Sequence, residues 1–421
     1  MNQKHIFERA HKVLPAGGFG NFDPRYIIRE GKGSRIWDED NNEYIDYLIG
    51  SGPMILGHCN SEVIEVVKEQ LGRGTSFFAN NAIGIELAEE ICSAIACAQQ
   101  VRFFSSGSEA DMYAFRLARA FTGRDKVMKF EGGYHGMSGE AQMSLAPGKL
   151  VNFPIAIPDS AGIQEGIRES MLVAPFNDIE LARSLINEHK NDIAAVIVEP
   201  LQRVIPPLNN FLKNLREECT KHDILLIFDE VVTGFRFSYG GAQELYGVTP
   251  DICTLGKIIG GGFPLAAVAG KSDIMAHFDK SKVEEDKFLM HIGTLSGNPI
   301  AAAAGLKTLE ILRRPNQYSK LETNGKKLMG AFTKHLSKTN HVYQIVGHPS
   351  MFDVVFSNSP IRNYRELAEC DKVKAARFNR DLLAQGIFKS PGKLYISLAL
   401  TDDDIEQTET AISNAVDSLS I

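Results

Sequence analysis

The order of apolar segments predicts an α/β fold, in which a largely parallel sheet carries helices on both faces. Short β-branched runs at 224–228 and 252–255 are typical of buried strands, and segments of helical periodicity separate such runs along the chain. The first run ends at Asp229, and the second leads to Lys257. Because ligands of open α/β sheets gather at the carboxyl ends of the strands, we expect both side chains at one functional edge.

The elements follow in chain order through three predicted regions. These are 1–55, the N-terminal segment of a small domain, 56–312, a large domain, and 313–421, the C-terminal part of the small domain. In the first region, residues 35–48 form a predicted hairpin around an Asp-Asn-Asn turn. Helices are predicted from apolar spacing at 61–71, 85–96, 109–121 and 299–312, and strands from short apolar runs at 101–105, 126–130, 194–198, 224–228 and 252–255. Residues 145–166 lack a clear period and are expected to form a loop near the functional edge.

The size and charge of the chain exclude several classes of protein. At 421 residues the chain is too long for one small core, so a principal domain with smaller lobes is expected. A net charge of -7 without any basic run disfavours nucleic acid and anionic membranes as partners. No apolar stretch approaches the roughly 18 residues of a membrane span, and the N-terminus lacks a signal-peptide core. The six cysteines form no CxxC pair and no metal-spaced cluster with histidine, which predicts a cytoplasmic protein without disulfides or a metal site.

Asp229 and Lys257 carry the two charges that a pyridoxal phosphate enzyme requires. A lysine forms a Schiff base with the cofactor aldehyde, and a carboxylate holds the pyridine nitrogen protonated so that the ring can absorb electrons from a carbanion. The glycine triplet at 260–262 follows Lys257 and would let the backbone approach a ligand closely. By itself, a lysine beside glycines is more often a solvated turn residue. The prediction therefore depends on the motifs that accompany it.

Two of these motifs contain a glycine next to a polar or aromatic group. In SSGSEA, at 105–110, Gly107 permits a tight turn, and the backbone and hydroxyl groups of Gly107 and Ser108 would face a phosphate at a helix N-terminus. The alternative is a simple serine N-cap with Glu109 in the first turn. In FEGGYHG, Tyr134 stands where an aromatic ring could stack on a planar cofactor, although an isolated tyrosine is usually a half-buried core residue.

Two further motifs place polar residues near the same expected edge. In VEPLQ, Glu199 and Gln202 follow a buried strand and could bond the cofactor's ring hydroxyl or the lysine-cofactor linkage; the alternative is a satisfied polar pair at a strand end. In GTLSGNP, Thr294 lies in a glycine-containing turn before a helix and could supply a second phosphate contact.

With these motifs in order, the chain resembles the class III, fold type I, pyridoxal-phosphate-dependent aminotransferases, and most closely the branch of the glutamate-1-semialdehyde aminomutases. The matching runs include PAGGFG, SSGSEA, FEGGYHG, FDEVVTGFRFSYGG, TLGKIIGGG and GTLSGNP. The resemblance implies a large domain with a mostly parallel seven-stranded sheet flanked by helices, and a smaller α+β lobe from both ends of the chain.

The resemblance also implies residue roles. Lys257 would be the Schiff-base lysine and would carry a proton between Cα and C4′, while Asp229 would face the pyridine nitrogen. Ring faces would be covered by Val231 and Tyr134, and the phosphate would be bound by Gly107, Ser108 and, from the neighbouring subunit, Thr294. That last role implies a homodimer with shared active sites. Arg25 falls near the place of a carboxylate-binding arginine in the family, the alternative being an exposed loop arginine.

Departures from the aminomutase pattern bear on the substrate. Aminomutases carry a tryptophan before the Gly-Pro pair, where this chain has Ser51, so the substrate pocket is expected to differ in shape there. They also carry an acidic residue in the C-terminal lobe, where this chain reads KSPGKLYISLAL at 389–400 without a carboxylate. That tail is similar to the tail of the β-amino-acid aminotransferases of the same class. Those enzymes, however, place an arginine soon after the N-terminal Gly-Gly pair, where this chain has Phe19, Gly20 and Asn21, so the chain lies between the subgroups.

The sequence therefore predicts a ping-pong aminotransferase that moves an amino group between an amino acid or amine and a keto acid or aldehyde. An alternative with the same cofactor is an isomerase, either glutamate-1-semialdehyde 2,1-aminomutase or an amino-acid racemase. An alternative of another class is a non-catalytic protein that only binds pyridoxal phosphate. A nicotinamide-dependent dehydrogenase is disfavoured, because no GxGxxG joins a first strand to its helix.

Overall fold

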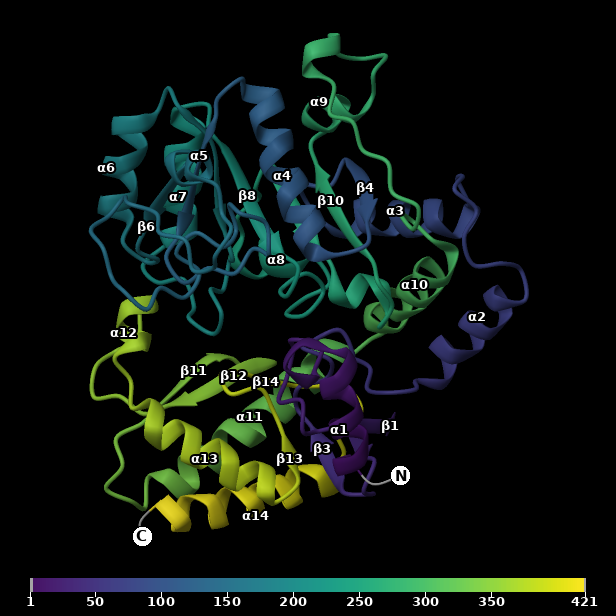
Figure 1. The fold of residues 1–421 in the computed structure, drawn as a ribbon, viewed down its shortest axis with the longest axis vertical. Helices are drawn as coiled ribbons and strands as arrows, with labels where there is room; N and C mark the ends of the chain where they lie inside the picture. The colour runs from purple at the N-terminus through teal and green to yellow at the C-terminus, as the bar shows by residue number, and fades with distance from the viewer. Residues whose placement is uncertain (1–2, 420–421) are drawn as a thin grey trace.

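A seven-stranded sheet forms the centre of the larger part of the molecule (Figure 1). The computed structural model describes residues 3–419. The strand order is β4-β10-β9-β8-β7-β5-β6. The strands are β4 (Gln100–Phe104), β5 (Lys126–Phe130), β6 (Met171–Ala174), β7 (Ile193–Val198), β8 (Leu225–Glu230), β9 (Ile252–Leu255) and β10 (Ala266–Gly270). Only β10 runs against its neighbours, so the predicted mostly parallel sheet is confirmed.

Helices cover both faces of this sheet, as predicted. Along β7, Ala195 and Ile197 belong to one buried cluster together with residues of α4, whereas Val196 and Val198 belong to another with residues of α6, α7 and α10. This alternation follows from the two-residue period of a strand, and it makes β7 apolar throughout. The helices of this part are α2 (Ser61–Leu71), α3 (Ala82–Ala94), α4 (Gly107–Thr122), α5 (Glu165–Glu169), α6 (Ile179–His189), α7 (Phe211–Lys221), α8 (Gly241–Tyr246), α9 (Ser272–Met275) and α10 (Pro299–Arg313).

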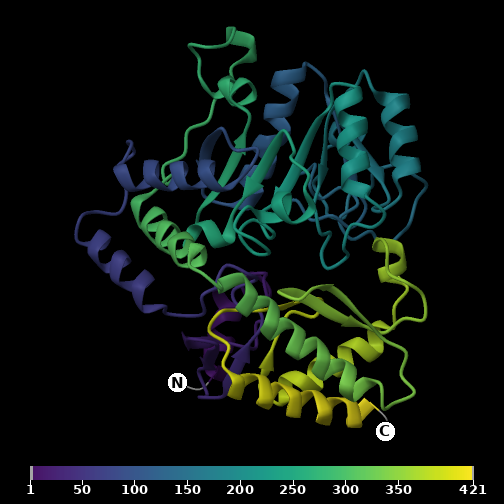
Figure 2. The same ribbon diagram turned by 180° about the vertical axis from the view of Figure 1, so that it is seen from behind.

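The smaller lobe is built from the first and last segments of the chain, which share one lobe although the N and C marks lie on opposite sides of it (Figures 1 and 2). One sheet joins β1 (Ile28–Lys32), β2 (Arg35–Asp38), β3 (Glu43–Asp46) and β13 (Ile387–Phe388), and a second joins β11 (Gln344–His348), β12 (Met351–Val355) and β14 (Leu394–Tyr395). The helices are α1 (Gln3–Val13), α11 (Gln317–Leu336), α12 (Tyr364–Ala368), α13 (Lys372–Ala384) and α14 (Asp402–Leu419). Because β13 pairs with β3, we propose that 1–55 and 313–421 form one small domain beside a large domain at 56–312.

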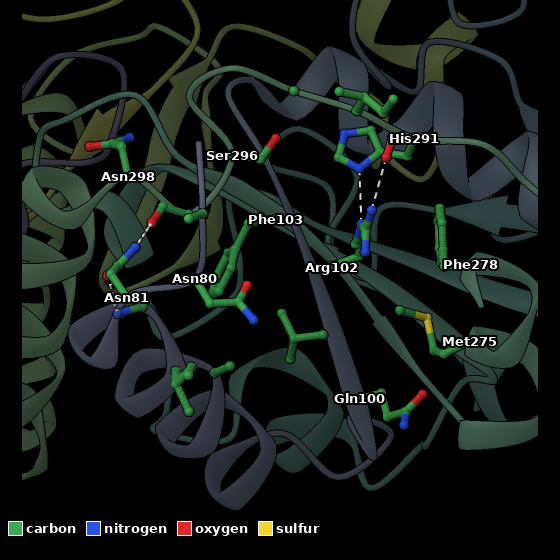
Figure 3. Close-up of a pocket in the computed structure, with 18 of the residues that line it drawn as sticks. Asn80, Asn81, Gln100, Arg102, Phe103, Met275, Phe278, His291, Ser296 and Asn298 are labelled. Carbon is green, nitrogen blue, oxygen red and sulfur yellow. Dashed lines mark hydrogen bonds between the residues drawn. The ribbon is translucent and has the colours of Figure 1, made fainter. Parts of the chain in front are cut away.

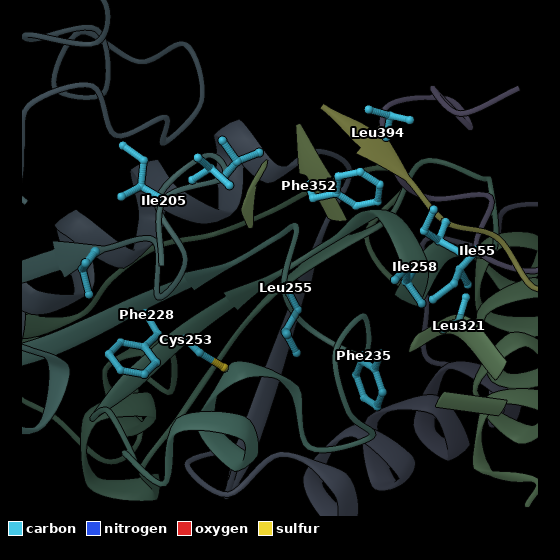
Figure 4. Packing of buried hydrophobic residues seen from close by; sticks show 14 of the residues in the cluster. Ile55, Ile205, Phe228, Phe235, Cys253, Leu255, Ile258, Leu321, Phe352 and Leu394 are labelled. Atoms are coloured by element: carbon cyan, nitrogen blue, oxygen red, sulfur yellow. The ribbon is translucent and has the colours of Figure 1, made fainter. Parts of the chain in front are cut away.

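One hydrophobic cluster continues from the large sheet into the smaller lobe. Figure 4 shows Leu255 and Ile258 of the large part together with Ile55, Leu321 and Leu394, and all five belong to this cluster. The segment that carries Lys257 is therefore anchored by apolar contacts that reach both lobes, so its backbone is held in place from two sides.

The predicted elements agree closely with the observed ones. The hairpin forms between β2 and β3, and helix α2 has the predicted bounds. Helix α3 begins three residues before its predicted start, because the Asn81 side chain accepts from the Gly84 amide and caps it there. Strands β6 and β10 have no predicted counterpart; the sequence of β10, AAVAG, is rich in small residues that favour strands weakly. No helix among residues 3–419 is long and apolar enough to cross a membrane.

Candidate active site

Asp229 lies near the carboxyl end of β8 and is only 5% exposed. Its Oδ2 lies 2.8 Å from Nδ1 of His135, and its Oδ1 accepts from the Val231 amide at 3.1 Å and from the Thr254 hydroxyl at 3.4 Å. Both carboxylate oxygens are thus fixed by the protein. A buried acid held in one orientation is suited to face a single cationic group of a ligand.

A second buried carboxyl group, that of Asp111 on α4, lies beside Asp229. The Thr254 hydroxyl donates to Asp111 at 2.7 Å and links the two acids. Burial and the negative charge of Asp229 raise the pKa of Asp111 well above its ordinary value. The neutral form of Asp111 is therefore easier to form than that of an ordinary aspartate. The sequence analysis does not predict a role for Asp111 or His135. Asp111 is an acid in the predicted helix at 109–121, and His135 belongs to the FEGGYHG motif, so each has a signal in the sequence.

Lys257 follows β9 and lies close to Asp229 in the sheet topology. Asp229 pairs with Thr254 in the register of β8 and β9, and the chain then turns into the short η2 helix (Lys257–Gly260). Lys257 has a φ of 50°, a left-handed conformation that is uncommon for a residue with a Cβ. Burial lowers the pKa of Lys257, and the charges of Lys393 and Arg236 lower it further against the opposing effects of Tyr395 and Asp229. The amine therefore loses its proton more readily than an ordinary lysine.

The N-terminus of α4 faces Val231 and the turn before Lys257. Ser106 caps the helix by accepting from the Glu109 amide at 3.2 Å, so the simple N-cap is present. The amides of Gly107 and Ser108 come first in the helix, where no intrahelical carbonyl can accept from them. A Cβ on Gly107 would stand 3.0 Å from Cγ1 of Val231. Val231 therefore packs closely against Gly107, beside the positive end of the helix where an anion could bind.

The glycine segment with Tyr134 is tied to the end of β7. The Tyr134 amide donates to Glu199 at 3.0 Å, and Gln202 donates through Nε2 to the Glu131 carbonyl at 2.8 Å. The guanidinium of Arg203 lies 5.3 Å from the centre of the Tyr134 ring. In the described part of the chain, Oε1 of buried Gln202 and Nε2 of buried His135 have no hydrogen-bond partner. Such orphaned polar atoms are costly without a ligand or water, so they point to a polar group that binds here.

The structure does not bring all predicted site residues together. The Arg25 side chain is 74% exposed, and its Nε donates to Asp23 at 2.9 Å. Ser51 interacts with the buried Tyr395 hydroxyl, which is close enough to Lys257 for their charges to interact. Thr294 lies elsewhere, on the exposed wall of a cavity of about 900 Å³. Figure 3 shows this cavity, with Arg102 held by His291 on one wall.

This arrangement of an acid, a lysine and a helix N-terminus at one sheet edge agrees with the comparisons with known proteins. The aminotransferase class-III family matches the chain over residues 20–416. The chain belongs to this family. The family predicted from the sequence motifs is thereby confirmed, and so is its fold.

Three solved structures are similar over nearly the whole length of this class III aminotransferase. An omega-transaminase from Sphaerobacter thermophilus is 33% identical, with 100% of this chain and 98% of that chain covered and a TM-score of 0.93. A transaminase with pyridoxal phosphate bound is 29% identical, with coverage of 100% and 98% and a TM-score of 0.90. A β-phenylalanine aminotransferase from Variovorax paradoxus is 31% identical, with coverage of 99% and 94% and a TM-score of 0.88.

The cofactor of this class III aminotransferase is pyridoxal phosphate, and its chemistry is amino-group transfer. The residues of the chain fit this cofactor. The edge of the sheet offers a lysine whose pKa is lowered, a fixed buried acid, a helix N-terminus at Gly107, and two orphaned polar atoms. Within residues 3–419, no cluster of histidine, cysteine and acidic side chains could hold a metal ion.

Proposed function

We propose that Lys257 and Asp229 perform the amino-group transfer, with the remaining site residues holding the cofactor and the substrates. The observation that carries this proposal is their joint position. Asp229 is fixed by His135 at the carboxyl end of β8, and Lys257, with a lowered pKa, leaves the neighbouring strand β9. No ion pair joins the Asp229 and Lys257 side chains in the described chain, so the two groups do not neutralise each other directly and both can contact a ligand.

When bound, pyridoxal phosphate supplies an aldehyde that takes up the amino group and a ring that absorbs the electrons left by the departing Cα proton. In our proposal, Nζ of Lys257 would accept that proton and give it back, because its lowered pKa makes the neutral amine easier to form. The Asp229 carboxylate holds a proton on the ring nitrogen, and His135 keeps the carboxylate turned toward it. Asp229 is buried, and Lys257 is partly buried beside it.

The cofactor contacts that we propose follow the sequence predictions. The first-turn amides of Gly107 and Ser108 bind the phosphate, and the side chains of Val231 and Tyr134 cover the two ring faces. Glu199 and Gln202 bond the ring hydroxyl region, which the unpartnered Oε1 of Gln202 supports.

For the substrates, we propose a small amino donor and a keto acceptor, with the reacting amine away from an α-carbon. The similar proteins named an omega-transaminase and a β-phenylalanine aminotransferase support this choice. Ser51 lies at Tyr395 and would contact the substrate. Arg25 remains a proposed carboxylate contact, although a substrate would have to replace its present pairing with Asp23.

All six cysteines are free, which supports a cytoplasmic location.

A requirement for a keto acid separates this proposal from an isomerase. An aminomutase must retain its diamine intermediate, which the missing tryptophan at Ser51 and the missing carboxylate at 389–400 should make harder. With catalytic enzyme and an amino donor, we expect product to accumulate only when a keto acid such as pyruvate is added. We also expect glutamate-1-semialdehyde to give little 5-aminolevulinate in the absence of a keto acid. Efficient conversion without one would identify an aminomutase, and an unchanged cofactor spectrum with every amine would identify a non-catalytic binding protein.

We further propose a homodimer in which Thr294 completes the phosphate site of the other subunit. The cavity that contains Thr294 is bordered by exposed apolar side chains, among them Phe77, Phe78, Ile85 and Ile292. A monomeric protein rarely leaves such a cluster open to water. A second copy of the chain would cover these side chains. It would also place Thr294 of one subunit at the phosphate site of the other subunit.

Light scattering should therefore give a mass near twice the chain mass of 46.4 kDa. Phe78→Asp places a charge on the proposed interface and should shift the protein toward monomers and raise the Kd for cofactor. Val373→Asp is the matched control, because Val373 is 82% exposed on α13, away from this cavity. A monomeric wild-type protein, or a Phe78→Asp variant that stays fully dimeric, would contradict this interface.

A further inference from the structure

A buried arginine close to Lys257 lacks the partners that its charge requires. Arg236 is 1% exposed, and one of its nitrogens, Nη2, donates to the Gly52 carbonyl. Among residues 3–419, no acceptor meets its Nε or Nη1, and no carboxylate forms an ion pair with it. Burial lowers the pKa of Arg236 to about 10, so the guanidinium is still charged at neutral pH. A buried charge with most of its donors unpaired is strongly unfavourable, which points to an anion as the binding partner of Arg236.

Arg236 lies next to Lys257, so an anion bound by its guanidinium would also lie near the reacting lysine. If Gly52 carried a Cβ, that atom would stand 3.6 Å from Nη2 of Arg236, 3.6 Å from Cδ of Lys257 and 3.3 Å from Cε1 of Tyr395. Nη2 of Arg236 and Cδ of Lys257 each lie 3.6 Å from this one point, so they are no farther apart than twice that distance. Gly52 has a φ of 112°, which also excludes most other residues. The side chains of Arg236, Lys257 and Tyr395 therefore meet in the space beside the Cα of this glycine.

The charges around this space are predominantly positive. The Arg236 guanidinium lies 5.0 Å from the centre of the Tyr395 ring, and Nζ of Lys393 lies 5.9 Å from it. Burial would raise the pKa of Tyr395, but the positive charges of Lys393, Lys257 and Arg236 outweigh it and hold this pKa below its ordinary value. The segment 389–400, which passes this point, contributes no carboxylate. The protein thus gathers cations here and leaves them without an acidic partner.

We propose that Arg236 binds the carboxylate of the amino donor and of the keto acceptor. This inference rests on the proposed function and narrows its substrate class. The donors would be amino acids whose carboxylate lies within a few bonds of the reacting amine, as in β-amino acids, in preference to simple amines. A guanidinium suits this task because its planar fork can donate two parallel hydrogen bonds to one carboxylate. Tyr395 covers the guanidinium and has to shift when the carboxylate binds.

The test compares two amines that differ only in the charged group. In 3-aminobutanoate a carboxylate occupies the position of a methyl group in 2-aminobutane. Holoenzyme is mixed with each amine alone, and the first half-reaction is followed by the absorbance of the cofactor, so no acceptor carboxylate interferes. Arg236→Gln should raise the half-saturating concentration of 3-aminobutanoate by about 10- to 100-fold, the usual worth of a charge-assisted contact, and that of 2-aminobutane by less than about threefold.

Two further variants keep the test decisive. Arg236→Lys retains the charge without the fork, so an intermediate effect confined to 3-aminobutanoate is expected, and this variant decides if Arg236→Gln does not fold. Arg168→Gln, at an arginine on α5 whose partner Glu165 is 3.5 Å away, is the control and should behave as wild type. Equal effects of the Arg236 variants on both amines would overturn the proposal.

Calorimetry with butanoate gives a readout that is independent of turnover. Butanoate should bind wild-type holoenzyme, and at least tenfold more weakly to Arg236→Gln. If neither amine reacts with wild-type enzyme while butanoate still binds through Arg236, the proposed function fails and the anion site stands. If butanoate binds both proteins equally, or does not bind wild type, the anion site is wrong whatever the activity.

Discussion

Replacing Lys257 with alanine is expected to abolish turnover while the protein stays folded. The expected loss is at least roughly 10⁴-fold, because the variant lacks both the nucleophile and the group that moves the proton, and a positioned proton-transfer group alone contributes about 10²- to 10⁴-fold. The rate constant kcat should fall in proportion, as measured with a coupled assay for the keto product. Half of the wild-type activity remaining in Lys257→Ala would show that another residue reacts.

Arginine at the same position separates charge from reactivity. A guanidinium keeps the positive charge but cannot be deprotonated at any pH at which the protein is folded. Lys257→Arg should therefore be as inactive as Lys257→Ala. The matched control is Lys271→Arg, since Lys271 is half exposed, forms an ion pair with Asp251 at 2.5 Å and should accept the change without loss of rate.

Asp229→Asn should lower kcat by roughly 10³-fold, because an amide cannot hold a proton on the ring nitrogen and one well-placed charged group is worth about 10²- to 10³-fold. The side chain keeps its shape, and its oxygen can still accept from the Val231 amide. Some cofactor should therefore remain bound, as judged by its absorbance after gel filtration. Near-normal kcat would place Asp229 outside the reaction.

Asp111→Asn is the control for that experiment, since Asp111 is a second buried acid linked to Asp229 through Thr254. The pKa of Asp111 is raised well above its ordinary value of 3.8, so asparagine imitates its neutral form and kcat should change by less than about tenfold. The raised pKa of Asp111 also predicts how the free energy of unfolding changes with pH. A folded-state pKa above the unfolded value means that the stability contributed by this proton is lost as the pH rises toward the folded pKa. The free energy of unfolding of Asp111→Asn should therefore fall less with rising pH than that of wild type.

The fold and the two central residues could be predicted because their signals are local. Asp229 and Lys257 each follow a short apolar run, and the rule that parallel strands end at one edge brings them together without knowledge of the contacts. The N-terminal hairpin and helix α2 follow from a turn and from one apolar period. Strand β10 carries neither signal, because small residues pack between helices as well as in sheets.

The remaining parts of the site depend on contacts between residues that are distant in the sequence. His135 matters because it meets Asp229, Asp111 because Thr254 joins it to the same acid, and Arg236 because a glycine loop brings it to Lys257. None of these pairings has a periodic pattern. Arg25 illustrates the opposite case, since the resemblance places it near a substrate carboxylate while its contacts in the structure are with Asp23.

Lys257 has the central role in the proposed reaction, because it would hold the cofactor and carry out the transfer. Reduction of the holoenzyme with borohydride, followed by digestion and mass spectrometry, tests this claim directly. We expect the pyridoxyl group on the peptide that contains Lys257, and its absence from the same peptide of Lys257→Arg. A pyridoxyl group on Lys393, on Lys129 or on any other lysine of the wild-type protein would contradict the assignment.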